Sequence, residues 1–539
     1  MKKLIFIAAA LCFAAASHAQ TTLTVPLTKQ MGRKTLMSMS FICLEYPKDD
    51  PLQTLFEKVK GIPKTLLNPS VRVFHLQPVQ FFYNARKAGA VSDKEFKQRA
   101  EWSDTSMVTS RYVNEQMSIV IGNDKDSNIV AYVDTNNDQN FSDEEIIVCK
   151  RLTKAEEMKL DERTLPVKEV AFDYFDGKSI RKASAFISLN PYLRNFSFQT
   201  PLSQQFLAVS LTEHRTGKAT IKGKTYRFDV SNAGVSGIYD RKSLKMLVSK
   251  AGVDSNESEM ANLSYRAGEM LNFDGEEYQI AAIDPLGERL TLIYKGYNAN
   301  PTGVHVGQYA PEISAKTTEG KPFKLSGLKG KYVLVDFWGT WCGPCVASIP
   351  SLGELYSLYG GEKFEIASVA AEFDSTDVKF KKFIVEKEMR WTNLRQNIRD
   401  QSDSAAQNVY HVSRYPLTFL LNPEGKIIAF DVEASEVVEL LKKNLGEPNP
   451  KNIDKMLAGN GTLFEVERPN AKSVYVTGSF NNWSKSMMFK KDGKWIRRVD
   501  LKSGEHQYKF IVDNEWITDP KNTATKADGE YINSVLTVK

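Results

Sequence analysis

Two cysteines separated by two residues offer the clearest chemistry in this sequence. Cys342 and Cys345 enclose a Gly-Pro dipeptide and directly follow Trp341. A thiolate at the first cysteine can attack a substrate disulfide, and the second cysteine can then resolve the mixed disulfide. A zinc site is the alternative for a cysteine pair, but structural zinc needs four ligands and the sequence has no second paired-cysteine motif. Redox chemistry is therefore the favoured interpretation.

The residues around this pair predict a strand that runs straight into a helix. Residues 332–337 form an apolar run with a single acid, as expected of a buried central strand. From 346 to 359, apolar residues recur at helical spacing. Cys342 would lie at the helix start, where unpaired N–H groups and the helix dipole favour a thiolate. Pro344 would fall in the first turn, where its missing N–H costs nothing.

Strand and helix patterns alternate throughout residues 304–446, which predicts an α/β domain. Turn-rich sequence borders this segment, near residue 300 on one side and at 447–461, the predicted linker, on the other. The further elements expected within it are strands at 364–370, 417–421 and 427–430, and helices at 376–388 and 437–445.

The segment 304–446 resembles the thioredoxin superfamily, and specifically its exported TlpA/ResA-like branch. The resemblance rests on Gly307 to Pro311 at the start, Trp341 to Cys345 at the site, and Tyr415-Pro416 before a strand. It implies a thiol–disulfide oxidoreductase with a thioredoxin fold. It also implies roles for individual residues: Cys342 as nucleophile, Cys345 as resolving thiol, Pro416 as a cis-proline beside the cysteines, and Tyr415 as a residue that faces the substrate.

Two acids are candidates for proton transfer at this site. Asp336 occupies the position of the buried thioredoxin acid, where burial would raise its pKa and let it accept the proton of Cys345. Many TlpA-like proteins instead have an asparagine-like residue at this position. The acid in this sequence therefore resembles thioredoxin itself. Glu372 matches the approximate place of a second acid in the ResA-like group. An ordinary carboxylate at a strand end is an equal alternative for Glu372.

The Gly-Pro dipeptide between the cysteines resembles reducing thioredoxins, with potentials near about −270 mV, rather than strong oxidants near about −120 mV. A reductase outside the cytoplasm must be recharged, so the resemblance implies a membrane thiol donor of the CcdA/DsbD type. Substrates would be disulfide-bearing proteins or small molecules, and the cysteine pair would need no further cofactor. The alternative is a glycan-binding or envelope assembly protein that uses the thioredoxin-like domain as a scaffold.

Residues 462–539 are rich in β-branched and alternating runs and predict a small immunoglobulin-like β-sandwich. They resemble the glycogen-binding module of AMP-activated kinase β subunits, a CBM48-like module. The matching stretches are 474–483, 492–495, 504–513, 516–520 and 533–535. The resemblance implies α-glucan binding through Trp483, Lys509, Trp516 and Asn533, since aromatic faces with a few polar groups suit a sugar. Alternatively, these residues complete a sandwich that is kept for protein contacts.

Residues 20–300 predict a mainly β region of one or two domains, whose role the sequence does not indicate. Hairpin turns are expected at Gly223-Lys224 and Asp274-Gly275, between alternating runs. The strands expected are 129–133, 219–221, 225–230, 271–273 and 278–283, and helical patches are expected at 51–60, 93–100 and 153–159.

One loop in this region has the ligand spacing of a calcium-binding EF-hand. Asp134, Asn136, Asp138 and Asn140 alternate along it, and Glu145 stands at position twelve. Gln139 replaces the glycine expected at position six, and the flanks look like strands. An Asx-rich turn without metal is the alternative.

Residues 1–19 predict a cleaved signal peptide, with Lys2 and Lys3 before an apolar run and a small-residue cleavage site at 17–19. The protein is therefore expected in the periplasm or cell envelope, where Cys43 and Cys149 would be either a structural disulfide or two free buried thiols. The 539 residues are 42% hydrophobic and 25% charged, as in globular multidomain proteins. A formal charge of +6 without a long basic run gives no support for nucleic-acid binding.

Overall fold

The computed structural model describes most of the chain after the first twenty residues. The described residues are 21–32, 40–43, 50–56, 58–101, 103–149, 156, 164–190, 207–234, 236–252, 264–373, 377–400, 402–529 and 531–539. The predicted signal peptide and all but one residue of the predicted helix at 153–159 lie outside them. The chain divides into two compact units, residues 1–299 and 300–539. No helix in the described ranges is long and apolar enough to cross a membrane.

The first unit contains one seven-stranded antiparallel sheet in the order β12-β11-β10-β1-β15-β14-β13. Its first strand pairs with its last in sequence, since Thr22 lies opposite Ile293. The predicted turn at Asp274-Gly275 is present, with positive φ angles of 53° and 94°. The turn predicted at Gly223-Lys224 lies one residue earlier, at Lys222 and Gly223 (φ of 50° and 75°), because Lys224 already pairs with Ile221 in the sheet. The strands are β1 (Thr22–Met31), β10 (Glu213–Ile221), β11 (Lys224–Asn232), β12 (Leu244–Lys250), β13 (Met270–Phe273), β14 (Glu276–Ile283) and β15 (Arg289–Tyr297).

Two four-stranded sheets of this unit, in the orders β2-β9-β8-β7 and β3-β4-β5-β6, share a second hydrophobic core. Ile119 on one sheet and Ile187 on the other are both fully buried in it. The strands are β2 (Ser40–Cys43), β3 (Leu67–His75), β4 (Gln116–Asn123), β5 (Ile129–Val133), β6 (Ile146–Cys149), β7 (Val167–Phe175), β8 (Ile180–Asn190) and β9 (Leu207–Leu211). The helices are η1 (Pro51–Leu55), α1 (Pro78–Lys87), α2 (Asp93–Arg99) and η2 (Thr105–Met107).

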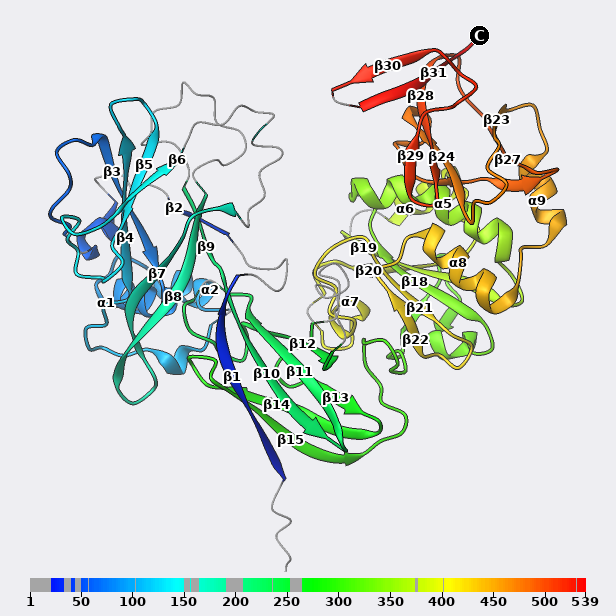
Figure 1. The fold of residues 1–539 in the computed structure, drawn as a ribbon. Helices are drawn as coiled ribbons and strands as arrows, with labels where there is room; N and C mark the ends of the chain where they lie inside the picture. The colour runs from blue at the N-terminus through cyan, green and yellow to red at the C-terminus, as the bar shows by residue number, and fades with distance from the viewer. Residues whose placement is uncertain are drawn as a thin grey trace, which may run out of the picture. The chain divides into compact units, whose positions relative to one another are not determined.

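The second unit begins with a five-stranded sheet in the order β20-β19-β18-β21-β22, covered by helices (Figure 1). Strand β18 is central: it runs parallel to β19 and antiparallel to β21. Its side chains alternate between two cores, so that Leu334 and Trp338 face one and Val335 and Phe337 face the other. Burial on both faces explains why its sequence reads as one apolar run.

The elements of this sheet and its helices follow the predicted order. They are β16 (Ser314–Lys316), β17 (Pro322–Lys324), η5 (Leu325–Leu328), β18 (Tyr332–Trp338), α5 (Gly343–Tyr359), β19 (Phe364–Glu372), α6 (Asp377–Glu386), β20 (Thr392–Asn397), α7 (Ala406–Val409), β21 (Leu417–Leu421), β22 (Ile427–Phe430) and α8 (Ala434–Leu445). The sequence did not indicate β20, because this edge strand is almost entirely polar and lacks an apolar alternation.

The segment predicted as a linker, 447–461, contains the helix α9 (Pro450–Leu457), which begins at the side-chain cap of Asn449. Ile453 and Met456 pack against the core that α5 and α8 share, and the Asn452 amide donates to the carbonyl of Leu358 (3.0 Å). This amphipathic helix therefore joins the two domains as a packed element.

The last residues form a sandwich of a three-stranded sheet (β23-β27-β26) and a larger sheet (β25-β24-β28-β31-β30, with β29 paired to β28). Its own core contains Phe464, Val476 and Phe510. The elements are β23 (Thr462–Val466), β24 (Val474–Gly478), η7 (Ser479–Asn481), β25 (Ser486–Met487), β26 (Phe489–Lys491), β27 (Lys494–Val499), β28 (Gly504–Val512), β29 (Glu515–Ile517), β30 (Thr525–Asp528) and β31 (Tyr531–Val538).

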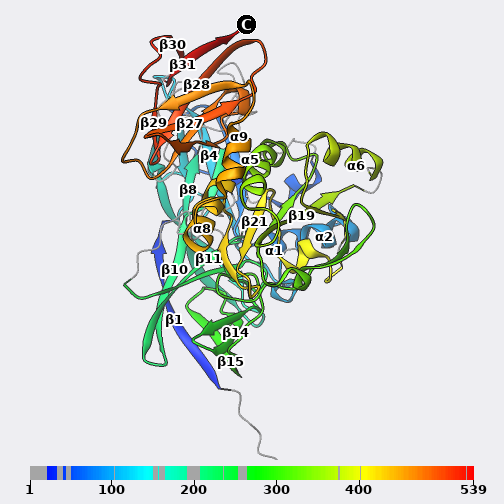
Figure 2. The ribbon, with the colours of Figure 1, turned by 90° about the vertical axis from the view of Figure 1, so that its right-hand side faces the viewer.

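The sandwich lies directly on the helices of the thioredoxin-like domain, above α5 in both views (Figures 1 and 2). Tyr475, Met487 and Ile511 belong to the same buried core as α5 and α8. Within this interface, the Glu354 carboxylate of α5 pairs with the Arg497 guanidinium of β27 at 2.6 Å. The domain interface is therefore an apolar contact with one largely buried ion pair.

Candidate active site

Cys342 caps the N-terminus of α5, at the junction with the central strand. Its sulfur accepts a hydrogen bond from the backbone N–H of Cys345 at 3.2 Å. The two sulfurs form a disulfide, with an S–S distance of 2.07 Å. Cys342 and Cys345 are 5% and 1% exposed. After reduction, the same N–H and the helix dipole would stabilise a thiolate on Cys342, the more exposed of the two.

The loop before the cysteines is held in place by Trp341. Its indole N–H donates to the carbonyl of Ala371 at 2.8 Å, and its ring stands edge-on to Tyr415, 5.3 Å between centroids. Gly339 makes this packing possible, because a Cβ there would lie 2.6 Å from the indole nitrogen of Trp341. Trp341 is 46% exposed, so one side of the ring faces solvent beside the disulfide.

The loop that enters β21 lies beside the cysteines and contains a cis peptide bond between Tyr415 and Pro416. The Tyr415 hydroxyl donates to the side-chain carbonyl of Gln407 at 3.4 Å. Burial raises the pKa of Tyr415, so the phenol stays neutral. The ring contact between Tyr415 and Trp341 joins this loop to the loop that precedes Cys342. Sequence patterns did not indicate Gln407, since a lone glutamine in a short helix has no distinctive spacing.

Asp336 lies in the middle of β18 and is almost completely buried. Its carboxylate accepts a hydrogen bond from the Ser368 hydroxyl at 3.1 Å, and that hydroxyl in turn accepts one from the Trp391 indole at 2.8 Å. Burial raises the pKa of Asp336 to about 7. The group can therefore gain or lose a proton near neutral pH. Ser368 was recognisable only as a polar residue in an apolar strand, and Trp391 carried no signal.

Glu372 ends β19 and is 1% exposed. Its carboxylate accepts hydrogen bonds from the backbone N–H of Thr340 at 2.6 Å and from the Thr340 hydroxyl at 2.8 Å. These bonds fix the loop two residues before Cys342. Neither predicted reading of Glu372, proton transfer or an ordinary strand end, included this contact.

Two of the four predicted glycan-binding residues lie at one cavity, and the other two do not line it. Trp483 and Trp516 line one cavity, and Trp516 is 50% exposed. The Lys509 ammonium lies 5.7 Å from the ring centre of Tyr531, and Asn533 is buried and donates to Gln507 at 2.9 Å. Only the tryptophans, among the residues predicted for this module, line that cavity.

The residues of the predicted calcium loop are held by hydrogen bonds within the loop and by an ion pair. Gln139 adopts the left-handed conformation expected of the missing glycine, with φ of 61°. The Asp134 and Asn140 side chains accept bonds from backbone N–H groups of the loop, and Glu145 pairs with Lys168 at 2.7 Å. Among the described residues, no three His, Cys, Asp or Glu side chains gather as metal ligands. The calcium site at Asp134, Asn136, Asp138, Asn140 and Glu145 therefore stays a prediction.

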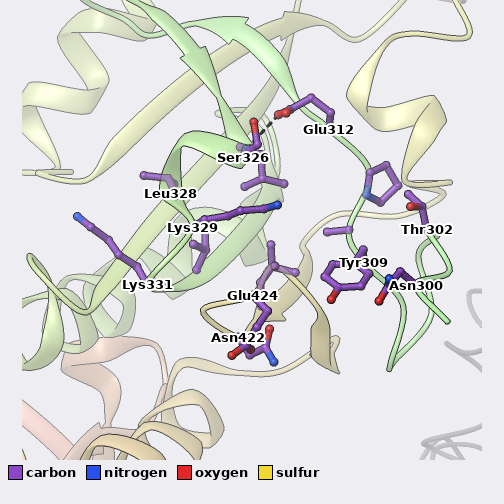
Figure 3. Close-up of a pocket in the computed structure, with 16 residues that line it drawn as sticks. Asn300, Thr302, Tyr309, Glu312, Ser326, Leu328, Lys329, Lys331, Asn422 and Glu424 are labelled. Atoms are coloured by element: carbon purple, nitrogen blue, oxygen red, sulfur yellow. Dashed lines mark hydrogen bonds between the residues drawn. The ribbon is translucent and has the colours of Figure 1, made fainter.

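A separate cavity of about 640 Å³ lies at the opposite end of the central sheet (Figure 3). Val333, at the start of β18, lines it, whereas the cysteines follow the other end of that strand. Lys329, Lys331 and Glu424 are among the residues that line it (Figure 3). Its position excludes it from direct contact with the disulfide.

Cys43 and Cys149 lie in β2 and β6, which belong to different sheets of the first unit. Their side chains lie outside the described part of the structure, so both readings of this pair stay predictions.

A disulfide at a helix start, reached from a central strand and flanked by a cis-proline, defines a thiol–disulfide oxidoreductase with a thioredoxin fold. Two family models match the chain: "AhpC/TSA family" over residues 306–430 and "Glycogen recognition site of AMP-activated protein kinase" over residues 462–539.

The relatives named thiol-disulfide oxidoreductase ResA include one from Bacillus cereus (strain ATCC 10987 / NRS 248), 30% identical over 158 residues. That match covers 29% of this chain and 87% of the relative. The ResA of Bacillus subtilis (strain 168) is 34% identical over 25% of this chain and 72% of its own length. A solved thioredoxin domain of a Bacteroides vulgatus thiol-disulfide oxidoreductase is 30% identical, covers 26% of this chain and 98% of its own, and has a TM-score of 0.24. The chain belongs to the ResA family of thiol–disulfide oxidoreductases.

Proposed function

We propose that the protein is an exported reductase that exchanges the Cys342/Cys345 dithiol with disulfides of proteins or small molecules. The observation that carries this proposal is the cysteine pair at the start of α5, next to the cis peptide bond of Pro416. The predicted signal peptide at residues 1–19 supports export to the periplasm or cell envelope.

The reaction starts from the reduced protein. The Cys342 thiolate attacks one sulfur of the substrate disulfide and forms a mixed disulfide, while the other substrate sulfur leaves as a thiolate and takes up a proton. Cys345 then attacks the sulfur of Cys342 and releases the second substrate thiol. Asp336 accepts the proton of Cys345 during this step, for which a pKa of about 7 is suited. Two electrons pass from the dithiol to the substrate.

The reducing direction is supported by the dipeptide Gly343-Pro344 between the cysteines, which resembles that of reducing thioredoxins. A reductase in an oxidising compartment needs a source of electrons. We infer that a membrane thiol donor of the CcdA/DsbD type returns the Cys342–Cys345 disulfide to the dithiol.

The test combines a reduction potential with disulfide turnover. The intact protein is expected to have a potential nearer to about −270 mV than to about −120 mV and to reduce a protein disulfide. Cys342→Ser is expected to abolish turnover, and turnover retained in that variant would leave a scaffold as the better reading. Cys345→Ser is expected to hold substrates as mixed disulfides on Cys342, which mass spectrometry would identify.

A second proposed function is α-glucan binding by the C-terminal sandwich through Trp483 and Trp516, with Lys509 and Asn533 as polar contacts. The family model over residues 462–539 favours it, and the half-exposed Trp516 offers a flat apolar surface. The intact protein is expected to be retained on immobilised α-glucan, and Trp483→Ala with Trp516→Ala is expected to abolish retention. Absence of retention of the intact protein would contradict this function.

A further inference from the structure

The cavity lined by Trp483 and Trp516 also borders the two loops that hold the cysteine pair and Pro416. It has a volume of about 550 Å³, a size typical of sites for small molecules. From the thioredoxin-like domain it is lined by Pro344, between the two cysteines, and by Pro416, the cis-proline. From the sandwich it is lined by the two tryptophans. Residues of the predicted sugar site and of the predicted disulfide site thus form the walls of one cavity.

The sandwich is attached to the catalytic helix at the edge of this cavity. The Ser484 hydroxyl donates to the carbonyl of Ala347 on α5 at 3.5 Å. The Lys485 ammonium pairs with Glu433, the capping residue of α8, at 3.3 Å. These contacts fix the residues next to Trp483 to both helices that flank the redox site. The tryptophans are therefore part of a built wall of the cavity.

The lining favours a ring with many hydroxyl groups. Two indoles supply flat apolar faces, and the polar groups around them are of mixed character: the carboxylates of Asp431 and Glu433 and the ammonium of Lys485. The Asp431 carboxylate pairs with the Arg414 guanidinium, and Glu433 pairs with Lys485 at 3.3 Å. These paired charges favour a neutral ligand over an ionic one, and the polar walls disfavour a long acyl chain. A hexose presents apolar C–H faces to aromatic rings and hydroxyl groups to carboxylates and ammonium groups.

We propose that this cavity binds a hexose unit of the disulfide-bearing substrate, so that the sugar is recognised next to the sulfur chemistry. The inference rests on the proposed thiol–disulfide exchange and names the class of its substrate. With the hexose between the tryptophans and the proline loops, the attached disulfide is presented to Cys342. Exchange then follows the balance given above: the dithiol supplies two electrons, the substrate leaves as two thiols, and the cysteine disulfide forms.

Two kinds of molecule carry this chemistry: a protein with a glycan near its disulfide, and a small disulfide of a thiol-bearing sugar. Each has a matched control without sugar. Thioglucose disulfide is compared with hydroxyethyl disulfide, and a glycoprotein disulfide is compared with the same protein after removal of its glycan. A preference confined to one comparison identifies the source of the sugar.

The experiment measures single-turnover oxidation of the reduced full-length protein, so that no external reductant takes part. The intact protein is expected to react roughly ten-fold faster with a hexose-bearing disulfide than with its sugar-free control. In Trp483→Ala with Trp516→Ala, this ratio is expected to fall to about one. Leu463→Ala, an exposed apolar side chain on the other sheet of the sandwich, is the matched control and is expected to keep the ratio.

The outcomes separate this inference from the proposed function. If neither member of either pair oxidises the intact protein, the proposed exchange itself fails. If the sugar-free disulfides react and no preference is seen, or if the double variant keeps the preference, the hexose site is overturned while the exchange function stands. Should the double variant not fold, free maltotriose is expected to slow only the hexose-bearing disulfides with the intact protein. The absence of such slowing overturns the hexose site.

Discussion

The carboxylate of Glu372 accepts two hydrogen bonds from Thr340, one from its backbone N–H at 2.6 Å and one from its hydroxyl at 2.8 Å. Thr340 precedes Cys342 by two residues, and Glu372 stands at the end of the neighbouring strand. The loop before the cysteines is therefore tied to β19 by two buried hydrogen bonds. In this arrangement Glu372 acts as a positioning residue for the disulfide.

Replacement of Glu372 by Ala is expected to leave the Thr340 N–H and hydroxyl without their buried partner. The free energy of unfolding is expected to fall by about 1–3 kcal/mol, and disulfide exchange is expected to slow because the loop loosens. Thr340→Val removes only the hydroxyl and is expected to cost less. Urea unfolding of both variants and of the double variant checks the coupling, and fully additive costs would contradict it.

Asp336 is expected to make stability depend on pH. Burial raises its pKa to about 7, so the folded protein holds the proton after the unfolded chain has released it. Stability therefore falls as pH rises, by about 1.4 kcal/mol per unit between the ordinary aspartate pKa and about 7, and is level above that. Asp336→Asn is expected to lack this loss. Urea unfolding of both proteins is measured at about pH 4, 5.5 and 7, which spans the range between the two pKa values. If the unfolding free energies of the two proteins change with pH in parallel, the prediction is refuted.

The same substitution is expected to slow the step in which Cys345 attacks the mixed disulfide, because the asparagine cannot take up a proton. Attack by Cys342 on the substrate needs no proton acceptor in the interior and is expected to change less. Rapid-quench measurement of the mixed disulfide is the check. Accumulation of this species in Asp336→Asn supports the role, and an unchanged decay with an unchanged pH profile argues against it.

Gly339→Ala is expected to displace Trp341. The new methyl group would lie 2.6 Å from the indole nitrogen and 3.0 Å from the carbonyl of Ala371, so the hydrogen bond between them would break. A loss of about 1–3 kcal/mol in unfolding free energy and slower exchange are expected. Gly353→Ala is the control, since a Cβ there meets no atom within 4 Å and alanine favours the helix. Equal behaviour of the two variants would exclude a steric role of Gly339.

The ion pair between Glu354 and Arg497 is expected to matter for the attachment of the sandwich. Both side chains are largely buried (19% and 10% exposed), and burial raises the pKa of Glu354 while Arg497 opposes that rise. Glu354→Ala leaves the guanidinium buried without its partner and is expected to cost roughly 3–5 kcal/mol. Lys491→Ala, which breaks an exposed pair with Asp454 at 3.9 Å, is expected to cost no more than about 1 kcal/mol. Equal losses of stability in the thermal unfolding of the two variants would contradict the prediction.

The sequence by itself indicated an α/β domain with a cysteine pair at a helix start, and a terminal β-sandwich, because these depend on local patterns. The apolar run before Trp338, the helical spacing after Cys345 and the turn residues of the hairpins each operate within a few neighbouring positions. The resemblance added the roles of Pro416 and Asp336. The expected strands at 129–133 and 417–421 are β5 and β21 with the same bounds.

Only the tertiary structure decided which distant residues meet. The partnership of Ser368 with Asp336, the bonds between Glu372 and Thr340, and the pairing of β1 with β15 join positions that share no local pattern. The same holds for the cavity that Trp516 and Pro416 both line. Such contacts follow from how sheets and helices pack in three dimensions, and periodicity along the chain does not encode them.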